Sequence, residues 1–267
     1  MDAYSGLETE TYHNGKLEII YLNEPDSYNA LHPVLLKNLR QAIQCLENKE
    51  EVRCIAISGR GKAFCSGQNI KKVIGLFPNS KERAVEKVMK ECYNPLVKTI
   101  VDLRKPVISL VNGPAVGAGA LLALICDFSL AVNTAYFSCS FINIGLIPDT
   151  GGTYFLPRLL GRSLANYWAF TGKKIESKEA QKRGLVAEIF DEEVFKEKTL
   201  YLLEKVVNMP TKTIGYTKQA FRESYHNTLE LQLQREAFYQ QLASETQDFS
   251  EGIRAFNEKR APNFSGK

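Results

Sequence analysis

Histidine is scarce in this chain of 267 residues. The three histidines, His13, His32 and His226, stand far apart in the sequence, and none lies in a setting typical of Ser-His or Cys-His catalysis. Neither a zinc-ligand spacing nor an HExxH motif is present. The sequence therefore gives no support for a zinc enzyme or for a nucleophile activated by histidine.

The cysteines contain no CxxC pair, and most of them lie in apolar strings, so we expect reduced core side chains in a reducing compartment. The N-terminal MDAYSGLETE is acidic and lacks the apolar run of a signal peptide, and the C-terminal SGK is not the peroxisomal SKL. We therefore expect a cytoplasmic protein. The six cysteines are Cys45, Cys54, Cys65, Cys92, Cys126 and Cys139.

The chain also lacks a large net charge. The formal net charge is only +4, which is too mild to predict a nucleic-acid partner, although the segment from Arg60 to Lys105 is basic enough to lie near an anionic ligand. From Pro106 to Pro148 the only charged residue is Asp127, but Asn112-Gly113-Pro114 would leave backbone groups unsatisfied in lipid. This run predicts a buried protein core and no membrane span.

The first elements are a hairpin and a helix. Asn14-Gly15 accepts positive φ at both central positions of a primed turn, and alternating strand residues flank it. Apolar residues then recur at helical spacing over 33–46.

A unit of strand, loop and helix follows and recurs along the chain. We expect strands at 52–58, 107–111 and 128–132 and an apolar helix at 120–126, an α/β architecture whose sheets are covered on both faces. The C-terminal part is expected to be helical: one helix ends at Met209-Pro210, a long one covers 212–245, and a last one begins near 248–250.

Two loops of small residues carry the chemistry. Gly117-Ala118-Gly119 follows a strand and precedes a helix, but it has neither the third glycine of a dinucleotide fingerprint nor the Gly-Lys-Ser/Thr of a P-loop. By itself it indicates tight helix-to-strand packing. Ser66-Gly67-Gln68 also follows an apolar strand, however, and two such loops side by side could present the paired N–H donors of an oxyanion hole, which contribute roughly 3 to 4 kcal/mol each.

Four segments resemble the crotonase superfamily, the enoyl-CoA hydratase/isomerase family, and the resemblance covers nearly the whole chain. They are Asn29-Ala30-Leu31, GKAFCSGQNI (61–70), PVISLVNGPAVGAGALLALICD (106–127) and IGLIPDTGGTYFLPRLLG (144–161). The last segment is most similar to the phenylacetate-pathway ring isomerase and the Δ3,Δ2-enoyl-CoA isomerase type.

The resemblance implies a site and an assembly. It places the oxyanion N–H groups on Gln68 and Ala118, the adenine-binding loop at 63–66, and an acyl-CoA thioester in the site without a metal or redox cofactor. It also implies a spiral core of β-β-α units over 1–200 and a helical region over 201–267 that helps form a homotrimer or hexamer. The residues expected to contact CoA are Lys62, Ala63, Cys65, Ser66, Gly67, Ile70 and Gly117.

Departures from the family pattern point to the reaction. The hydratases carry two catalytic glutamates at positions occupied here by Leu121 and Phe141, neither of which accepts a proton. Asp149 remains, at the place where relatives that shift double bonds carry an Asp or Glu. An acid among apolar neighbours has a raised pKa, so we expect Asp149 to be the acid/base of an enoyl-CoA isomerase.

Several alternatives stay open at this stage. Asp149 could instead cap a helix that starts near Gly151, and Asp127 is expected to be structural. The chain could be a hydratase or a hydrolase on the same scaffold, or a non-catalytic acyl-CoA- or RNA-binding member. The segment 71–98 is expected to wall the acyl pocket, with Ile74, Leu76, Phe77 and Met89 as selecting residues, while Lys81, Arg83, Lys87 and Lys90 form a solvated face and the aromatics form core or pocket lining.

Overall fold

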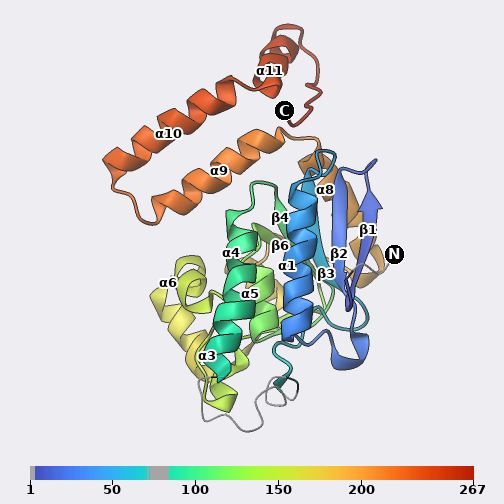
Figure 1. Cartoon of the computed structure of the whole chain (residues 1–267), viewed down its shortest axis with the longest axis vertical. Helices are drawn as coiled ribbons and strands as arrows, with labels where there is room; N and C mark the ends of the chain where they lie inside the picture. Colours follow the sequence, from blue (N-terminus) through green and yellow to red (C-terminus); the bar gives the residue numbers. More distant parts are fainter. Residues whose placement is uncertain (1–3, 71, 73–83) are drawn as a thin grey trace.

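A six-stranded sheet forms the centre of the fold in the computed structural model, which describes residues 4–70, 72 and 84–267 (Figure 1). The strand order is β1-β2-β3-β4-β6-β9, antiparallel between β1 and β2 and parallel elsewhere. Every residue of β2, β3 and β4 is buried, which confirms the prediction of a sheet covered on both faces. The strands are β1 (Leu7–Tyr12), β2 (Leu17–Leu22), β3 (Cys54–Gly59), β4 (Val107–Val111), β6 (Phe128–Val132) and β9 (Glu188–Phe190).

The predicted hairpin is confirmed. Tyr12 pairs with Leu17 at the end of the ladder, and the Lys16 N–H donates to the His13 carbonyl at 3.2 Å. Asn14 and Gly15 have φ values of 56° and 87°, as a primed turn requires at its two central positions.

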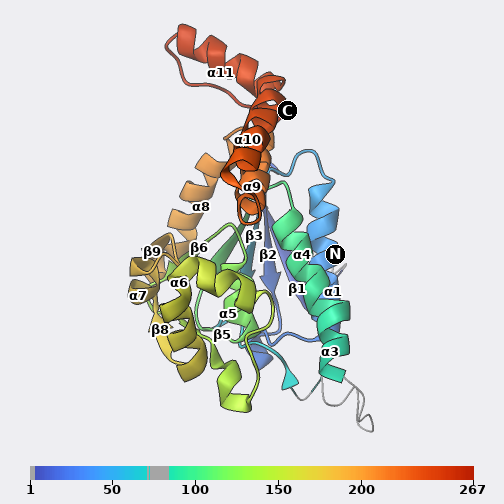
Figure 2. The ribbon, with the colours of Figure 1, turned by 90° about the vertical axis from the view of Figure 1, so that its left-hand side faces the viewer.

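Helix α1 (Pro33–Glu47) covers one face of this sheet beside α4, as Figures 1 and 2 show. His32 caps its N-terminus by accepting a hydrogen bond from the Leu35 N–H. The buried residues are those of the predicted apolar stripe: Leu35, Leu36, Leu39, Ala42, Ile43 and Leu46. Cys45 points to the outer face and is exposed, so the expectation of a core side chain is wrong for this cysteine, whereas the other five are buried free thiols.

A second, three-stranded sheet with the order β5-β7-β8 lies next to helix α5 (Ala118–Leu124). The predicted helix at 120–126 was placed two residues too late. Gly117, with φ 54°, lets the chain turn directly from β5 into the helix, so the Ala118 N–H belongs to its first turn. The strands are β5 (Ala115–Val116), β7 (Tyr136–Ser138) and β8 (Lys174–Glu176).

The other helices of the core surround the two sheets. Helix α8 contacts β2, β3 and β6, and the expected division of the chain at residue 200 falls inside this helix and stays a prediction. These segments are η1 (Pro25–Ser27), α3 (Ala84–Val88), the π-helical η2 (Met89–Tyr93), α4 (Asn94–Asp102), η3 (Ser140–Ile144), α6 (Gly152–Thr171), α7 (Ser177–Lys182), η4 (Glu192–Val194) and α8 (Phe195–Val207).

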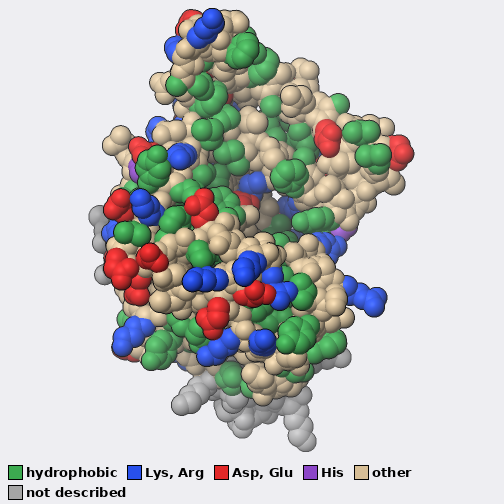
Figure 3. Space-filling model, turned by 180° about the vertical axis from the view of Figure 1, so that it is seen from behind, with side chains coloured by type: hydrophobic (Ala, Val, Ile, Leu, Met, Phe, Trp, Pro, Cys, Tyr) green, Lys and Arg blue, Asp and Glu red, His purple; other side chains and the backbone are tan. Residues whose placement is uncertain are grey.

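The C-terminal helices α9 (Thr211–Ser224), α10 (Leu229–Ser244) and α11 (Gln247–Asn257) project away from the core (Figures 1 and 2). The prediction of one long helix over 212–245 is wrong. The chain turns after α9, and Thr228 caps α10 by accepting a hydrogen bond from the Leu231 N–H at 3.3 Å, so α9 and α10 pack side by side. The opposite face of the molecule is hollowed between these helices and the core (Figure 3).

Candidate functional site

The two loops of small residues lie against each other. The Cys65 N–H donates to the Pro114 carbonyl at 3.2 Å, and the Val116 N–H donates to the Cys65 carbonyl at 2.9 Å. On the other side, the Leu31 N–H donates to the Gly67 carbonyl at 2.7 Å. These bonds fix the loop after β3 between the Asn29–Leu31 segment and the start of α5.

Two glycines make this close approach feasible. A Cβ on Gly67, whose φ is 91°, would lie 2.7 Å from the Val116 carbonyl oxygen and 3.5 Å from the Ala118 nitrogen. A Cβ on Gly119 would lie 2.4 Å from the Cys65 carbonyl oxygen. Glycine is therefore required at both positions, and Gly67, the residue before Gln68, is in contact range of the Ala118 amide.

The backbone N–H groups of Gln68 and Ala118 have no hydrogen-bond partner among the described residues. Ala118 is the first residue of α5, where an N–H lacks an intrahelical acceptor and carries part of the positive end of the helix dipole. The Gln68 N–H is adjacent to Gly67 at the facing loop. The structure thus places the two predicted donors on loops that contact each other, an arrangement that an oxyanion hole requires.

Asp149 lies at the turn that leads into α6. The Thr150 hydroxyl donates to Asp149 Oδ1 at 2.7 Å, and the Gly152 N–H donates to the Asp149 carbonyl oxygen at 2.6 Å. Burial raises the pKa of the Asp149 carboxyl above its usual range, although the hydrogen bond from Thr150 opposes this shift. A carboxyl with a raised pKa is suited to taking up and returning a proton near neutral pH.

The alternative that Asp149 caps a helix is wrong. The N-cap of α6 is Gly151, in the left-handed conformation, and no side chain bonds to the first turn of the helix. Asp127, in contrast, has the structural role expected of it, because it accepts a hydrogen bond from the Val107 N–H at 2.7 Å and pairs with Lys218 of α9.

Apolar side chains occupy the two positions where family hydratases carry glutamates. Leu121 is buried, and its methyl groups lie against Gly152 and thus against the Asp149 turn, because a Cβ on Gly152 would be 2.5 Å from Leu121 Cδ1. Phe141 is also buried, with its ring against Gly117 at the oxyanion loop. Both positions are therefore apolar. Neither side chain can hold a water molecule by a hydrogen bond or accept a proton from it.

The residues expected to contact CoA have mixed positions. Lys62, Ser66 and Ile70 are exposed, whereas Ala63 and Cys65 are buried in the core. Gly67 and Gly117 lie at the oxyanion loops described above. Burial raises the pKa of the Cys65 thiol to about 12, which keeps it neutral and unsuited to act as a nucleophile.

Asn29 holds the loop at 63–66 in place, a role that was not predicted from the sequence. Its side chain is fully buried, donates to the carbonyls of Arg60 and Ala63 at 2.9 Å each, and accepts from the Glu24 N–H at 2.9 Å. The signal was the position of Asn29 in the Asn29-Ala30-Leu31 segment that resembles the family. Its role is to hold the loop that follows β3.

Tyr93 is a second residue whose place sequence reasoning missed. It belongs to the aromatics that were expected to form core or pocket lining, and it is fully buried. Burial raises the pKa of its hydroxyl, and the nearby Asp149 carboxylate adds to the shift. The sequence gives no local signal for this place, because Asp149 lies in a distant segment of the chain.

The expected acyl-pocket wall is described only in part. Ile74, Leu76, Phe77, Lys81 and Arg83 lie outside the described residues. Met89 is half-buried and packs against the core. Lys87 and Lys90 are exposed, as a solvated face predicts, and Lys90 pairs with Glu86 at 2.6 Å.

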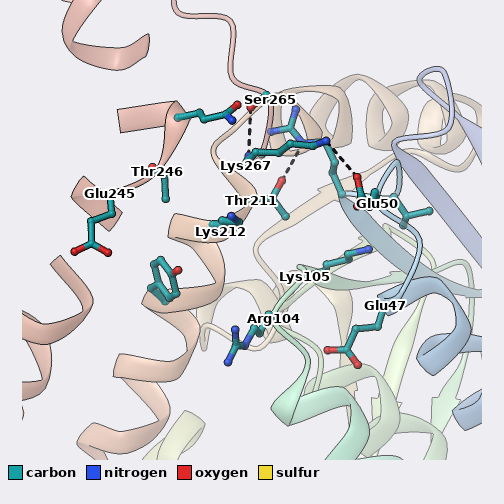
Figure 4. A pocket seen from close by; sticks show the side chains of 15 residues that line it. Glu47, Glu50, Arg104, Lys105, Thr211, Lys212, Glu245, Thr246, Ser265 and Lys267 are labelled. Atoms are coloured by element: carbon teal, nitrogen blue, oxygen red, sulfur yellow. Dashed lines mark hydrogen bonds and ion pairs between the residues drawn. The ribbon is translucent and has the colours of Figure 1, made fainter. Parts of the chain in front are cut away.

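A cavity of about 640 Å³ lies elsewhere, between the core and the C-terminal helices (Figure 4). Its charged lining residues come from α1, from the segments that precede β3 and β4, from α9, from the end of α10 and from the C-terminal tail, and Glu50 pairs with Lys267 there at 3.2 Å. None of the predicted site residues lines it.

No metal-binding cluster of three or more His, Cys, Asp or Glu side chains occurs within residues 4–70, 72 and 84–267. In the same ranges, no helix is both long and apolar enough to cross a membrane.

The model of the family described as enoyl-CoA hydratase/isomerase matches residues 13–267. The chain belongs to this family. It is 36% identical to the 1,2-epoxyphenylacetyl-CoA isomerase of Escherichia coli, over 92% of this chain and 94% of that protein. It is also 36% identical to a probable enoyl-CoA hydratase of Rhodobacter capsulatus, over 94% of this chain and 95% of that protein.

Solved structures of the family confirm the fold class. The enoyl-CoA hydratase from Bacillus anthracis superposes with a TM-score of 0.91 at 29% identity, covering 98% of this chain and all of that one. The protein is therefore an enzyme of the enoyl-CoA hydratase/isomerase family with the crotonase fold and a helical C-terminal region. Family membership alone leaves the two reactions, hydration and isomerisation, to be separated by the site.

Proposed function

We propose that this enzyme isomerises an unsaturated acyl-CoA by moving a double bond along the acyl group. The observation that carries the proposal is the half-buried carboxyl of Asp149 on a turn lined by Leu121, with no second carboxyl at the hydratase positions. Hydration needs a water held between two proton-transferring groups, whereas an isomerisation needs one group that removes a proton and returns it.

The proposed reaction uses the two loops and the carboxylate together. The N–H groups of Gln68 and Ala118 donate to the thioester carbonyl oxygen, while Asp149 takes a proton from the α-carbon. The electrons of that C–H bond form the enolate, whose negative oxygen the two N–H groups stabilise. The protonated Asp149 then donates to the γ-carbon, so the β,γ double bond becomes an α,β double bond and the carboxylate is restored.

This sequence of steps balances without an oxidant or a bound metal, so we propose that the enzyme requires neither a metal nor a redox cofactor. The CoA moiety belongs to the substrate. We expect Lys62 and Ser66 to contact it, and their exposure on the loop after β3 and the names of the relatives, which are CoA thioester enzymes, support this expectation.

Replacing Asp149 by Asn tests the function. The variant keeps the shape and one hydrogen-bond acceptor of the carboxyl but cannot accept the α-proton, so isomerisation of a 3-enoyl-CoA is expected to fall by at least about a hundredfold, with acyl-CoA affinity retained. Conversion is followed by the ultraviolet absorbance of the conjugated product. Asp102→Asn, at an exposed residue of α4, is the matched control and is expected to leave the rate unchanged.

Full turnover by Asp149→Asn rejects the proposal. Wild-type hydration of crotonyl-CoA at a rate comparable to isomerisation would favour the hydratase alternative, and a trapped acyl-aspartyl species would favour a hydrolase. Absence of turnover on any thioester, together with salt-sensitive RNA binding, would favour a non-catalytic member.

We also propose a homotrimer or hexamer in the cytoplasm. The C-terminal helices expose a set of large apolar side chains, which supports burial against another copy of the chain. The six free thiols support a reducing compartment. Analytical ultracentrifugation tests the assembly, and a monomer at micromolar concentration would reject it. The apolar side chains are Phe221, Leu229, Leu231, Leu233, Phe238, Phe249, Ile253 and Phe256.

A further inference from the structure

Thr150, the residue after Asp149, has a backbone conformation that threonine rarely adopts. Its φ is 50°, and Gly151 follows with φ 78°. With the hydrogen bond from the Gly152 N–H to the Asp149 carbonyl oxygen, these angles make a tight turn of the primed type over residues 149–152. Glycine, asparagine and aspartate dominate the central positions of such turns, and a β-branched residue there is strained. The choice of threonine therefore calls for an explanation beyond the turn itself.

Packing fixes the backbone of this turn. A Cβ on Gly151 would lie 3.1 Å from Phe155 Cδ2 and 3.4 Å from Val97 Cγ1, and Thr150 itself is 2% exposed. Residues in disfavoured backbone conformations persist where the surrounding structure determines them, and they cluster at functional sites. With the backbone fixed, the main freedom left to Asp149 is the rotation of its side chain.

The Thr150 hydroxyl restricts that rotation. It donates to Asp149 Oδ1 at 2.7 Å, and no other side chain within residues 4–70, 72 and 84–267 donates to this carboxyl. Burial raises the pKa of the carboxyl, and the hydrogen bond from Thr150, together with one from the N–H of Asp149, opposes that shift. A hydrogen bond to an ionised acceptor is stronger than one between neutral groups. The hydroxyl thus favours the ionised form of Asp149.

The same hydrogen bond distinguishes the two oxygens of the carboxyl. When Asp149 takes up a proton, one oxygen becomes a hydroxyl, and the other keeps the character of a carbonyl and remains an acceptor. The donor on Oδ1 therefore favours the proton on Oδ2. The Thr150 hydroxyl keeps its partner in both states, so it need not move when the proton arrives or leaves.

We propose that Thr150 is a positioning residue for the proton transfer by Asp149: its hydroxyl holds Oδ1, so that Oδ2 carries the mobile proton. Oδ2 takes the proton from the α-carbon, and the electron pair of that C–H bond forms the enolate. The Oδ2–H bond then breaks as its proton passes to the γ-carbon, and the carboxylate is restored. One oxygen held in place serves both carbons without rotation of the carboxyl. The inference rests on the proposed function.

Thr150→Val tests the inference, because valine keeps the size and branching of threonine but lacks the hydroxyl. Its kcat for isomerisation of a 3-enoyl-CoA is expected to fall about tenfold, the factor for losing one hydrogen bond to a charged group. KM is expected to stay unchanged, since Thr150 is buried and does not meet the substrate. Thr150→Ser keeps the hydroxyl and is expected to retain kcat. Thr150→Ala is a second variant without the hydroxyl, which keeps the test decisive if valine prevents folding.

The ionisation of Asp149 provides an independent readout. Carbon-13 NMR of the aspartate carboxyls follows its titration, and the signal absent from Asp149→Asn identifies it. Thr150→Val is expected to raise the pKa of Asp149 above that of wild type, because a donor to the ionised form is lost, so kcat/KM begins to fall at a higher pH on acidification. In the described part of the chain, Tyr93 and Cys139 are the titratable groups whose pKa values the Asp149 charge raises. Burial raises both further, that of Cys139 to about 12, so neither titrates in this range.

Thr199→Val is the matched control. Thr199 is also 2% exposed, and its hydroxyl donates to the Phe195 carbonyl at 2.7 Å within α8, which supplies none of the site residues. This variant is expected to unfold earlier than wild type without a change in kcat or in the titration of Asp149. A wild-type kcat or an unchanged Asp149 titration in Thr150→Val, or a Thr150→Ser as slow as Thr150→Val, would overturn the inference while an inactive Asp149→Asn keeps the proposed function. A wild-type rate in Asp149→Asn would reject the proposed function itself.

Discussion

Gly67→Ala is the sharpest perturbation of the proposed oxyanion hole, because it acts on the backbone and removes no polar group. The added Cβ would lie 2.7 Å from the Val116 carbonyl oxygen, closer than van der Waals contact allows, and the residue has φ 91°, where alanine is strained. The loop must shift, and the Gln68 N–H shifts with it. Ala118 would be left as the single donor.

The magnitude follows from these two terms. Holding alanine at positive φ costs about 1–2 kcal/mol of folding stability, and the loss of one oxyanion donor costs about 3–4 kcal/mol of transition-state stabilisation, or about a hundredfold to a thousandfold in kcat. The assay measures isomerisation of a 3-enoyl-CoA by the absorbance of the conjugated product, alongside thermal unfolding.

Gly15→Ala provides the control. Gly15 has a similar φ of 87° in the hairpin turn, but its added Cβ would come no closer than 3.7 Å to any other residue. Gly15→Ala is expected to lose about 1–2 kcal/mol of folding stability, the cost of holding alanine at positive φ, and to keep its activity. If Gly67→Ala keeps the wild-type kcat, or if both variants lose activity equally, the assignment of the Gln68 N–H is refuted.

Two further predictions concern the ionisation of Asp149 and the contribution of Arg53 to the free energy of unfolding. Since Asp149 must be ionised to accept the α-proton and burial raises its pKa, kcat/KM is expected to fall as pH decreases through a pKa above that of an ordinary aspartate, and a flat profile down to pH 4 would contradict this. Arg53, 5% exposed, donates to Thr211 Oγ1 and to the carbonyls of Met209 and Phe264, so Arg53→Met is expected to lower the free energy of unfolding by about 3 kcal/mol in urea titrations, and a change within error would contradict it.

Much of the fold could be predicted from local pattern. The Asn14-Gly15 turn and the apolar stripe of α1 depend on neighbours within a few residues, and both are confirmed. The long C-terminal helix was predicted wrongly because α10 has apolar residues on several sides, so no periodicity marked the break that Thr228 makes by capping. The exposure of Cys45 depends on which face of α1 meets the sheet.

The parts of the site whose backbone requires glycine could be predicted from the sequence. Gly67 and Gly117 have backbone conformations that other residues rarely adopt, so the two loops were visible in the sequence. Tyr93 was not, since its proximity to Asp149 depends on packing between α4 and the turn before α6, some fifty residues away along the chain. The loop at 63–66 could be predicted only in part. Its position was visible in the sequence, but the hydrogen bonds that Asn29 donates decide which of its side chains face outward.

The most direct test of proton transfer by Asp149 is an isotope measurement. A 3-enoyl-CoA with deuterium at its α-carbon is converted in ordinary water, and the product is examined by mass spectrometry and NMR for deuterium at the γ-carbon. Wild type is expected to carry part of the label to the γ-carbon, because one carboxyl removes and returns the same hydrogen, while Asp149→Asn forms almost no product. Rapid formation of labelled product by Asp149→Asn would contradict the account.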